Sequence, residues 1–121
     1  MAIPSGAGTE VIKRGHLLGS SITGSATVLL VGASAVHMNT VLSVTMCNTE
    51  SDTDITVDMY VEIGGSTAVY ILKDQAIGAK ETFIFNDRLV LEGLDELIVD
   101  FGGSSPDVDV YISYIDQEWP A

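Results

Sequence analysis

The clearest pattern in the chain is a nearly perfect alternation of apolar and polar residues between positions 54 and 63. Such a period of two is typical of a strand with one buried and one exposed face. A shift of one residue would bury Asp58 and Glu62, so the pattern predicts a single orientation on a core. The side chains predicted to face that core are Ile55, Val57, Met59, Val61 and Ile63.

Weaker versions of this pattern recur between turns rich in Gly, Asn and Asp, and no segment has the period of an amphipathic helix. The chain is therefore predicted to be all-β, with about eight short strands in a two-sheet antiparallel sandwich of jelly-roll or immunoglobulin-like type. Besides 54–63, the predicted strands are 27–31, 40–47, 67–72, 82–85, 88–91, 96–101 and 108–115. In the second of these, the predicted inward residues are Leu42, Val44 and Met46.

The connections are predicted from their turn-forming residues. Residues 48–54 are almost all turn formers and predict a hairpin-like link. Gly64 and Gly65 permit the positive φ of a tight turn. Residues 73–80 are predicted to be a loop, and Asn86-Asp87 a two-residue turn.

With 121 residues the chain is long enough for one sandwich core and too short for two. Residues 1–15 have no strand or helix period and predict an extended N-terminal arm. The sandwich is expected to span 16–117, and 118–121 to form a C-terminal tail. An arm lying on a neighbouring subunit and an untethered tail are both open at this point.

The formal net charge of -12 arises from 17 acidic residues against five Lys and Arg. A field of this sign repels phosphate, so we expect neither nucleic-acid binding nor docking on an anionic membrane. The N-terminus lacks the basic start and apolar run of a secretory signal, and no apolar run approaches the length of a membrane span. We therefore expect synthesis in a cytoplasm, without a visible export signal.

Few residues suggest chemistry. Cys47 is the single cysteine and lies in an apolar strand, which favours a small buried thiol over a nucleophile. His16 and His37 flank a glycine-rich stretch, and a proton shuttle or a two-histidine metal site is the alternative to loop or interface histidines. No nucleophile elbow, phosphate-binding loop or dinucleotide fingerprint is present, so no catalytic residue, and no enzyme, is predicted.

Two acidic clusters raise the question of calcium, and their members are Asp52, Asp54 and Asp58, and Asp107 and Asp109. The spacing departs from the helix-loop-helix template, because Val57 and Ile63 replace its glycine and glutamate. A solvated acidic rim is favoured, with Ca²⁺ as the alternative and no other cofactor expected. A glycosidase pair formed from Glu92, Asp95 and Glu96 is disfavoured in so small a domain.

Aromatic residues on exposed faces and the residues of the arm are the predicted interface. Exposed Tyr and Trp anchor protein contacts because they bury a large apolar area at the expense of few rotamers. The predicted interface residues are Ile3, Pro4, Val11, Lys13, Arg14, Tyr60, Tyr111 and Trp119.

Residues 40–117 resemble small β-sandwich structural proteins of tailed bacteriophages. The similarity lies in the segments CNTESD, VDMYV, YILKDQAIGAKET, RLVLEGLDELIVDFGG and VDVYISYI. The opening MAIPSGAGTEVIKR is similar to the start of virion proteins from marine phages. These are strand and turn patterns, so the resemblance implies no catalytic residues.

The resemblance implies a virion component, with a capsid decoration (cement) protein as the leading hypothesis. Its expected partners are further copies of itself, as a homo-oligomer and most simply a trimer, and the major capsid or other virion proteins. The alternatives are a small neck, tail or baseplate protein, and a carbohydrate- or receptor-binding module at the tail.

Overall fold

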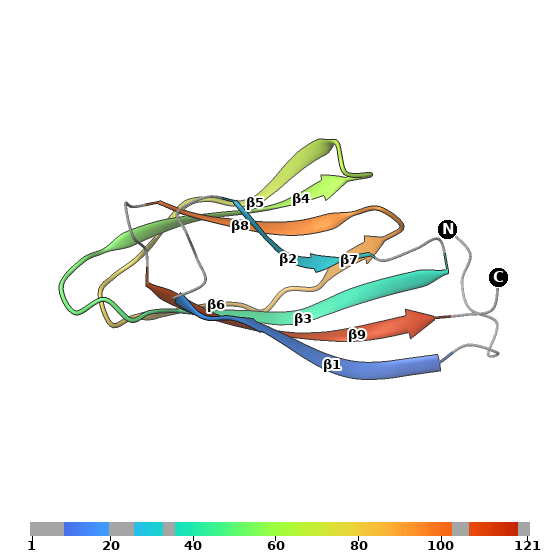
Figure 1. Ribbon diagram of the computed structural model, residues 1–121, viewed down its shortest axis with the longest axis horizontal. Helices are drawn as coiled ribbons and strands as arrows, with labels where there is room; N and C mark the ends of the chain where they lie inside the picture. The colour runs from blue at the N-terminus through green and yellow to red at the C-terminus, as the bar shows by residue number, and fades with distance from the viewer. Residues whose placement is uncertain (1–8, 20–25, 33–35, 103–106, 119–121) are drawn as a thin grey trace.

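The computed structural model describes residues 9–19, 26–32, 36–102 and 107–118, and they form an antiparallel β-sandwich (Figure 1). Its all-β, two-sheet architecture confirms the predicted fold class. No described helix is long and apolar enough to span a bilayer. The strands are β1 (Thr9–Leu17), β2 (Thr27–Val31), β3 (His37–Asn48), β4 (Ile55–Ile63), β5 (Thr67–Ile77), β6 (Thr82–Phe85), β7 (Leu89–Glu92), β8 (Glu96–Gly102) and β9 (Val108–Glu118).

The strands divide into two layers that face each other (Figure 1). The first sheet, sheet A, has the order β1-β9-β3-β6, and β7 pairs with the same edge of β3 as β6 does. The second, sheet B, has the order β2-β8-β4-β5. Among the described strands, β4 and β5 are the only neighbours that also follow each other in the chain, so almost every pairing joins distant segments.

The core lies between the sheets and is formed by the alternating apolar faces of their central strands. On β4, Ile55, Val57, Met59 and Val61 are buried as predicted. Ile63 is 48% exposed, because it stands at the turn where the sheet ends. The largest fully buried side chains of the other strands include Met46, Leu91, Leu97, Phe101 and Ile112.

The sandwich starts earlier than predicted. Residues 9–15, assigned to the arm from the sequence, belong to β1, which pairs with β9 without a register shift from Thr9 to Leu17. Most β1 side chains are exposed, so the sequence TEVIKRGHL carries no apolar alternation that would reveal a strand. Residues 1–8 of the predicted arm lie outside the described residues.

Three connections differ from the predictions. Residues 49–54 carry the chain from sheet A to sheet B and do not form a hairpin. β5 continues to Ile77, so most of the predicted loop 73–80 is strand. Asn86-Asp87 does not reverse the chain, because β6 and β7 pair in succession with the same strand β3. The predicted tight turn is confirmed, with φ of +62° at Gly64 and +77° at Gly65.

A β-bulge in β3 explains a further error. The register between β3 and β9 shifts between Val41 and Ser43. Val41 and Val44 are both fully buried on either side of the bulge, whereas Leu42 is only half-buried. The strict alternation that placed Leu42 in the core is wrong because the bulge inserts one residue. The break between β6 and β7 lies opposite this bulge.

Asn48 joins the end of β3 to the neighbouring loop and to β5. Its side chain is fully buried, and its Nδ2 donates to the carbonyl oxygens of Thr53 (2.9 Å) and Ile77 (3.1 Å). Its Oδ1 accepts the backbone N–H of Glu50 at 3.0 Å. One amide therefore satisfies three backbone groups where the chain passes between the sheets.

We expect Asn48→Ala to lower the free energy of unfolding by about 2–4 kcal/mol, since it leaves backbone groups without partners in a buried site. Urea denaturation followed by circular dichroism would measure this. The matched control is Asn86→Ala, because Asn86 is exposed and should change stability by less than about 0.5 kcal/mol. Equal losses in both variants would contradict the assigned role of Asn48.

Candidate interaction surfaces

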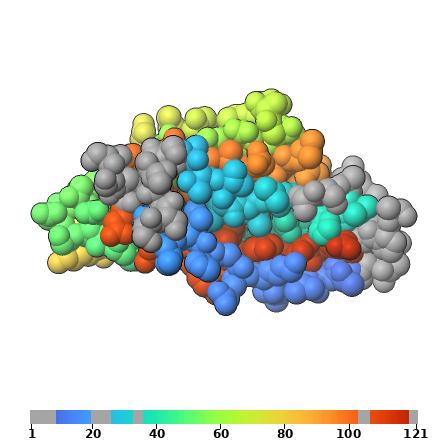
Figure 2. Space-filling view, viewed as in Figure 1, coloured from blue at the N-terminus to red at the C-terminus, as the bar shows by residue number. Residues whose placement is uncertain are grey.

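The free edge of β1 is the longest regular strand edge among the described residues. β1 has nine residues, and only its β9 side is paired. A regular edge strand presents unpaired N–H and C=O groups to which another chain can pair. In the space-filling view β1 forms the lower rim of the molecule (Figure 2, blue).

The other three sheet edges are interrupted. β2 has five residues and a register shift between Val28 and Leu30. The opposite edge of sheet A is split into β6 and β7, with four residues each. β5 is long, but its pairing with β4 shifts twice, and Asp74 has a φ of +51°. Short strands, bulges and charged side chains protect sheet edges; β1 carries Glu10, Lys13 and Arg14 but is neither short nor bulged.

The side chains of β1 divide between two faces. Residues 11, 13 and 15 lie opposite Asp116, Tyr114 and the buried Ile112, so they share the inner face of sheet A. The outer face carries Glu10, Ile12, Arg14 and His16. Ile12 is 74% exposed, the largest value among the described large hydrophobic residues.

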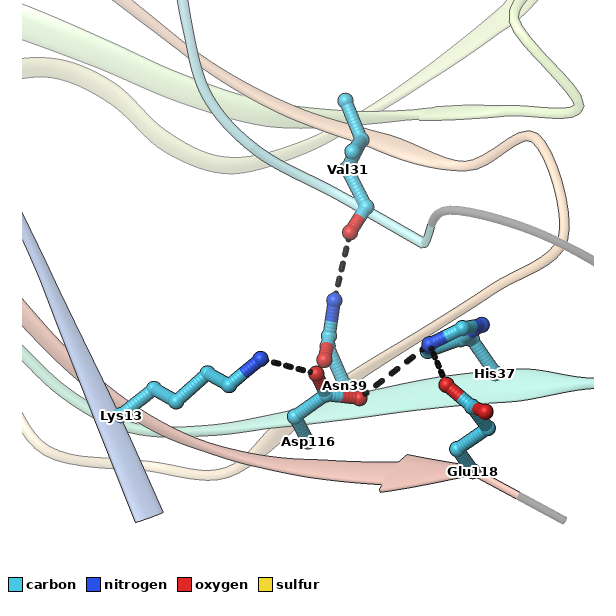
Figure 3. A network of polar contacts seen from close by, with 6 residues as sticks. All are labelled: Lys13, Val31, His37, Asn39, Asp116 and Glu118. Carbon is cyan, nitrogen blue, oxygen red and sulfur yellow. Dashed lines mark hydrogen bonds and ion pairs between the residues drawn. The ribbon is translucent and has the colours of Figure 1, made fainter. Parts of the chain in front are cut away.

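Lys13 is paired within its own chain. Its Nζ lies 2.7 Å from Oδ2 of Asp116 on β9 (Figure 3). The hydrogen bond from Lys13 to Asp116, reinforced by the attraction between their charges, raises the pKa of Lys13. Arg14 makes no ion pair with any described residue, so it is the cation that β1 leaves available for a partner.

The same end of the sandwich contains a polar network that links the two sheets (Figure 3). Asn39 is 5% exposed, and its Nδ2 donates to the carbonyl oxygen of Val31 on β2 at 2.6 Å. His37 Nε2 lies 2.7 Å from Glu118 Oε2 and 3.8 Å from Asp116 Oδ1. These contacts hold β1, β3, β9 and β2 together where the apolar core ends.

A shallow groove of about 400 Å³ lies on the outer face of sheet A. Tyr111, 48% exposed, lies in it beside Asp109 and Cys47. Cys47 is half-buried on this outer face, so the prediction of a buried thiol is wrong. The remaining side chains of the lining include Arg14, His16, Leu18 and Thr45.

The outer face of sheet B is aromatic and acidic. The rings of Tyr60 and Tyr70 lie with centroids 4.9 Å apart, and Lys73 Nζ is 4.8 Å from the Tyr70 centroid. Burial, followed by the surrounding negative charges, raises the pKa of Tyr60. Two pairs of like charges face each other across β4 and β8: Asp58 opposite Asp100, and Glu62 opposite Glu96.

Asp58 also holds the irregular part of β5. Its Oδ1 accepts the backbone N–H of Asp74 at 2.7 Å, and its Oδ2 lies 3.2 Å from Lys73 Nζ. The hydrogen bond from Asp74, and then the bond and charge of Lys73, lower the pKa of Asp58. The carboxylate stabilises the one β5 residue that adopts a left-handed conformation without being glycine.

The clusters that the sequence raised only as disfavoured alternatives are not assembled among the described residues. His16 and His37 lie opposite Tyr111 and Glu118 of β9, seven residues apart along that strand, or about 23 Å. Asp95 is buried and accepts the backbone N–H groups of Gly64 (2.9 Å) and Glu92 (3.2 Å), which is a structural role. Among the described residues, no three His, Cys, Asp or Glu side chains are placed to hold a metal ion.

The predicted interface residues that the structure describes do not form a single surface patch. Ile3, Pro4 and Trp119 lie outside the described residues. Val11, Lys13 and Arg14 lie together on β1, whereas Tyr60 and Tyr111 lie on the outer faces of different sheets. Ile12 was not among the predicted interface residues, although it is an apolar residue beside Val11 in a segment that also carries Glu10, Lys13 and Arg14.

No protein-family model and no curated protein sequence matches the chain. A similar solved structure is that of Bacillus endospore appendages, which form a family of disulfide-linked pili. Its TM-score is 0.55 at 11% identity, with 99% of this chain and 97% of that chain covered, which shows a common fold. A match to the structure of infectious bursal disease virus Gx strain has a TM-score of 0.35 at 8% identity and covers 95% of this chain and 36% of that chain, which does not show a common fold.

We expect the stabilisation provided by ionised Asp58 to be lost in acid. Because its pKa is lowered in the folded state, the contribution is complete above the pKa of the unfolded chain and disappears as the pH falls through the folded value. Asp58→Asn should therefore lower the free energy of unfolding at pH 7, and the difference should shrink towards pH 3. Urea denaturation at several pH values, with exposed Asp87→Asn as control, tests this; a pH-independent difference would contradict it.

Proposed function

We propose that this chain is a non-enzymatic structural subunit that assembles with further copies of itself in a larger particle. The observation that carries the proposal is the long, regular edge of β1, which among the described strands has neither the shortness nor the bulges of the other sheet edges. Addition of a strand to this edge gives affinity through backbone hydrogen bonds, which need no further specialised site.

The particle that we propose is a bacteriophage virion, with the chain as a capsid decoration protein that bridges neighbouring subunits; a neck, tail or baseplate position is the alternative. When β6 and β7 are counted as one interrupted strand, two four-stranded sheets remain, an arrangement compatible with a jelly roll. Jelly rolls are common in viral capsid proteins, which supports the proposal beside the resemblance described above. The net charge of -12 suits a position away from packaged nucleic acid.

The similar structure from endospore appendages supports repeated self-assembly as a use of this fold. A disulfide link between successive subunits is not available to this sequence, because its single cysteine can bond to only one other chain. We therefore propose that its assembly is non-covalent.

The number of subunits depends on what pairs with β1. A second β1 would close a two-fold contact, whereas the arm of the next subunit would allow a ring such as the trimer predicted from the sequence. In such a ring each subunit would contact the next through two different surfaces, the arm and β1. Removal of residues 1–8 would then abolish the ring.

A sugar-binding module is the second candidate, and the groove beside Tyr111 is the observation that favours it. A half-exposed tyrosine ring next to Arg14, His16 and Asp109 combines a stacking surface with hydrogen-bonding groups. Glycan-array binding that is lost in Tyr111→Ala and kept in Tyr70→Ala would support this function.

We expect Ile12→Lys to disrupt self-assembly, since it places a charge at the centre of the free edge. Light scattering over a range of protein and salt concentrations would show the wild type as an oligomer and the variant as a monomer. Ile84→Lys is the matched control, because Ile84 is 57% exposed on the opposite, interrupted edge of sheet A. A wild-type protein that remains monomeric throughout, or equal effects of the two variants, would contradict assembly through β1.

A further inference from the structure

β1 has a sequence that can pair with its own copy in one favourable register. Two identical antiparallel strands related by a two-fold axis through the sheet keep their outer faces on the same side. The axis must then pass midway between the two copies of one residue. The residue n places before this central residue faces the residue n places after it in the other copy. The choice of this central residue fixes every other contact.

We propose that two copies of the chain pair along β1 with Ile12 opposite Ile12, so that sheet A continues from one copy into the other. This register places Glu10 of each copy opposite Arg14 of the second copy. Ile12, the most exposed large hydrophobic residue among those described, is covered by its own counterpart, and Arg14, which has no ion-pair partner among them, meets a carboxylate. The inference rests on the proposed self-assembly and specifies its contact.

The neighbouring registers are less favourable. A centre at Lys13 places two ammonium groups opposite each other and sets Ile12 against Arg14. A centre at Glu10 or Arg14 also opposes like charges, and a centre at Val11 sets Glu10 against Ile12. Like charges directly opposite one another destabilise a strand pair, whereas opposite charges stabilise it.

The geometry within each copy is compatible with this contact. Glu10, Ile12 and Arg14 share the outer face because they lie opposite Gln117, Ile115 and Ser113. Ile12 and Ile115 would continue as an apolar row across both copies. On the inner face this register sets Val11 opposite Lys13 of the second copy, whose ammonium group is already paired with Asp116 of its own chain. The contact joins seven residues of each β1, from Thr9 opposite Gly15 to Gly15 opposite Thr9.

Cysteine cross-linking tests the register in the full chain with Cys47→Ser. Directly opposite residues have Cα atoms about 4.5–5.5 Å apart, within the range that a disulfide spans. Ile12→Cys should therefore give a covalent dimer under mild oxidation. Val11→Cys is the control, because the two Val11 Cα atoms would be about 8 Å apart, too far for a disulfide. Cross-linking of Val11→Cys at an equal or greater yield would overturn the register.

Charge exchange provides a second test that does not depend on a disulfide. Glu10→Arg and Arg14→Glu each create like-charge pairs, and each variant alone should dimerise about tenfold or more weakly than the wild type. Mixed together, they restore two opposite-charge pairs, and a heterodimer should form. Light scattering or native mass spectrometry would detect it.

The outcomes separate the register from the proposed function. A mixture that stays monomeric, while the wild type dimerises and Ile12→Lys does not, would overturn this register and leave assembly through β1 intact. A wild-type protein that is monomeric at every concentration would overturn both.

Discussion

Each sheet of this sandwich has one apolar face that must be covered by the other, and the rest of the structure depends on this constraint. The buried side chains of β4 and β8 face those of β3 and β9, with Phe101, Met46 and Met59 among the largest. Almost all neighbouring strands are distant in the chain, so the pairing joins segments that lie far apart in the sequence. The polar groups that the crossings would leave without partners are satisfied by a few buried side chains, of which Asn48, Asn39 and Asp95 are the clearest.

A sandwich of two open sheets covers its inner faces and leaves its sheet edges exposed. The edges of this sandwich differ in their length and regularity. A break between β6 and β7, the shortness of β2 and the bulges of β5 protect three of them. β1 has nine residues and pairs with β9 without a break or a register shift. Lys13 is neutralised by Asp116 within the chain, whereas Ile12 and Arg14 point outward without a partner among the described residues. This inequality is why we place the assembly surface on β1 in preference to the exposed tyrosines.

The acidic outer face of sheet B also affects which surfaces of the molecule can associate. Like charges face each other across β4 and β8, and only Asp58 has a lysine beside it. Such a face repels a second copy of itself, so self-association through sheet B is disfavoured. Of the five Lys and Arg residues, Lys73 lies at the β5 bulge, and Lys13 and Arg14 lie on β1. Charge thus favours one contact surface over another, in addition to the ion pairs that link strands within the chain.

The sequence by itself determined the fold class, the orientation of β4 and the tight turn at Gly64, because a period of two and a positive φ are local properties that a few residues express. It also indicated that Val11, Lys13 and Arg14 belong to an interface segment, although that remains a proposal. Only the tertiary structure decided that this segment is a strand, since an edge strand exposed on most of its surface has no apolar period to detect. The bulge at Leu42, the crossing after Asn48 and the continuous path from β6 to β7 were likewise decided by pairing with distant strands, which a local pattern does not encode.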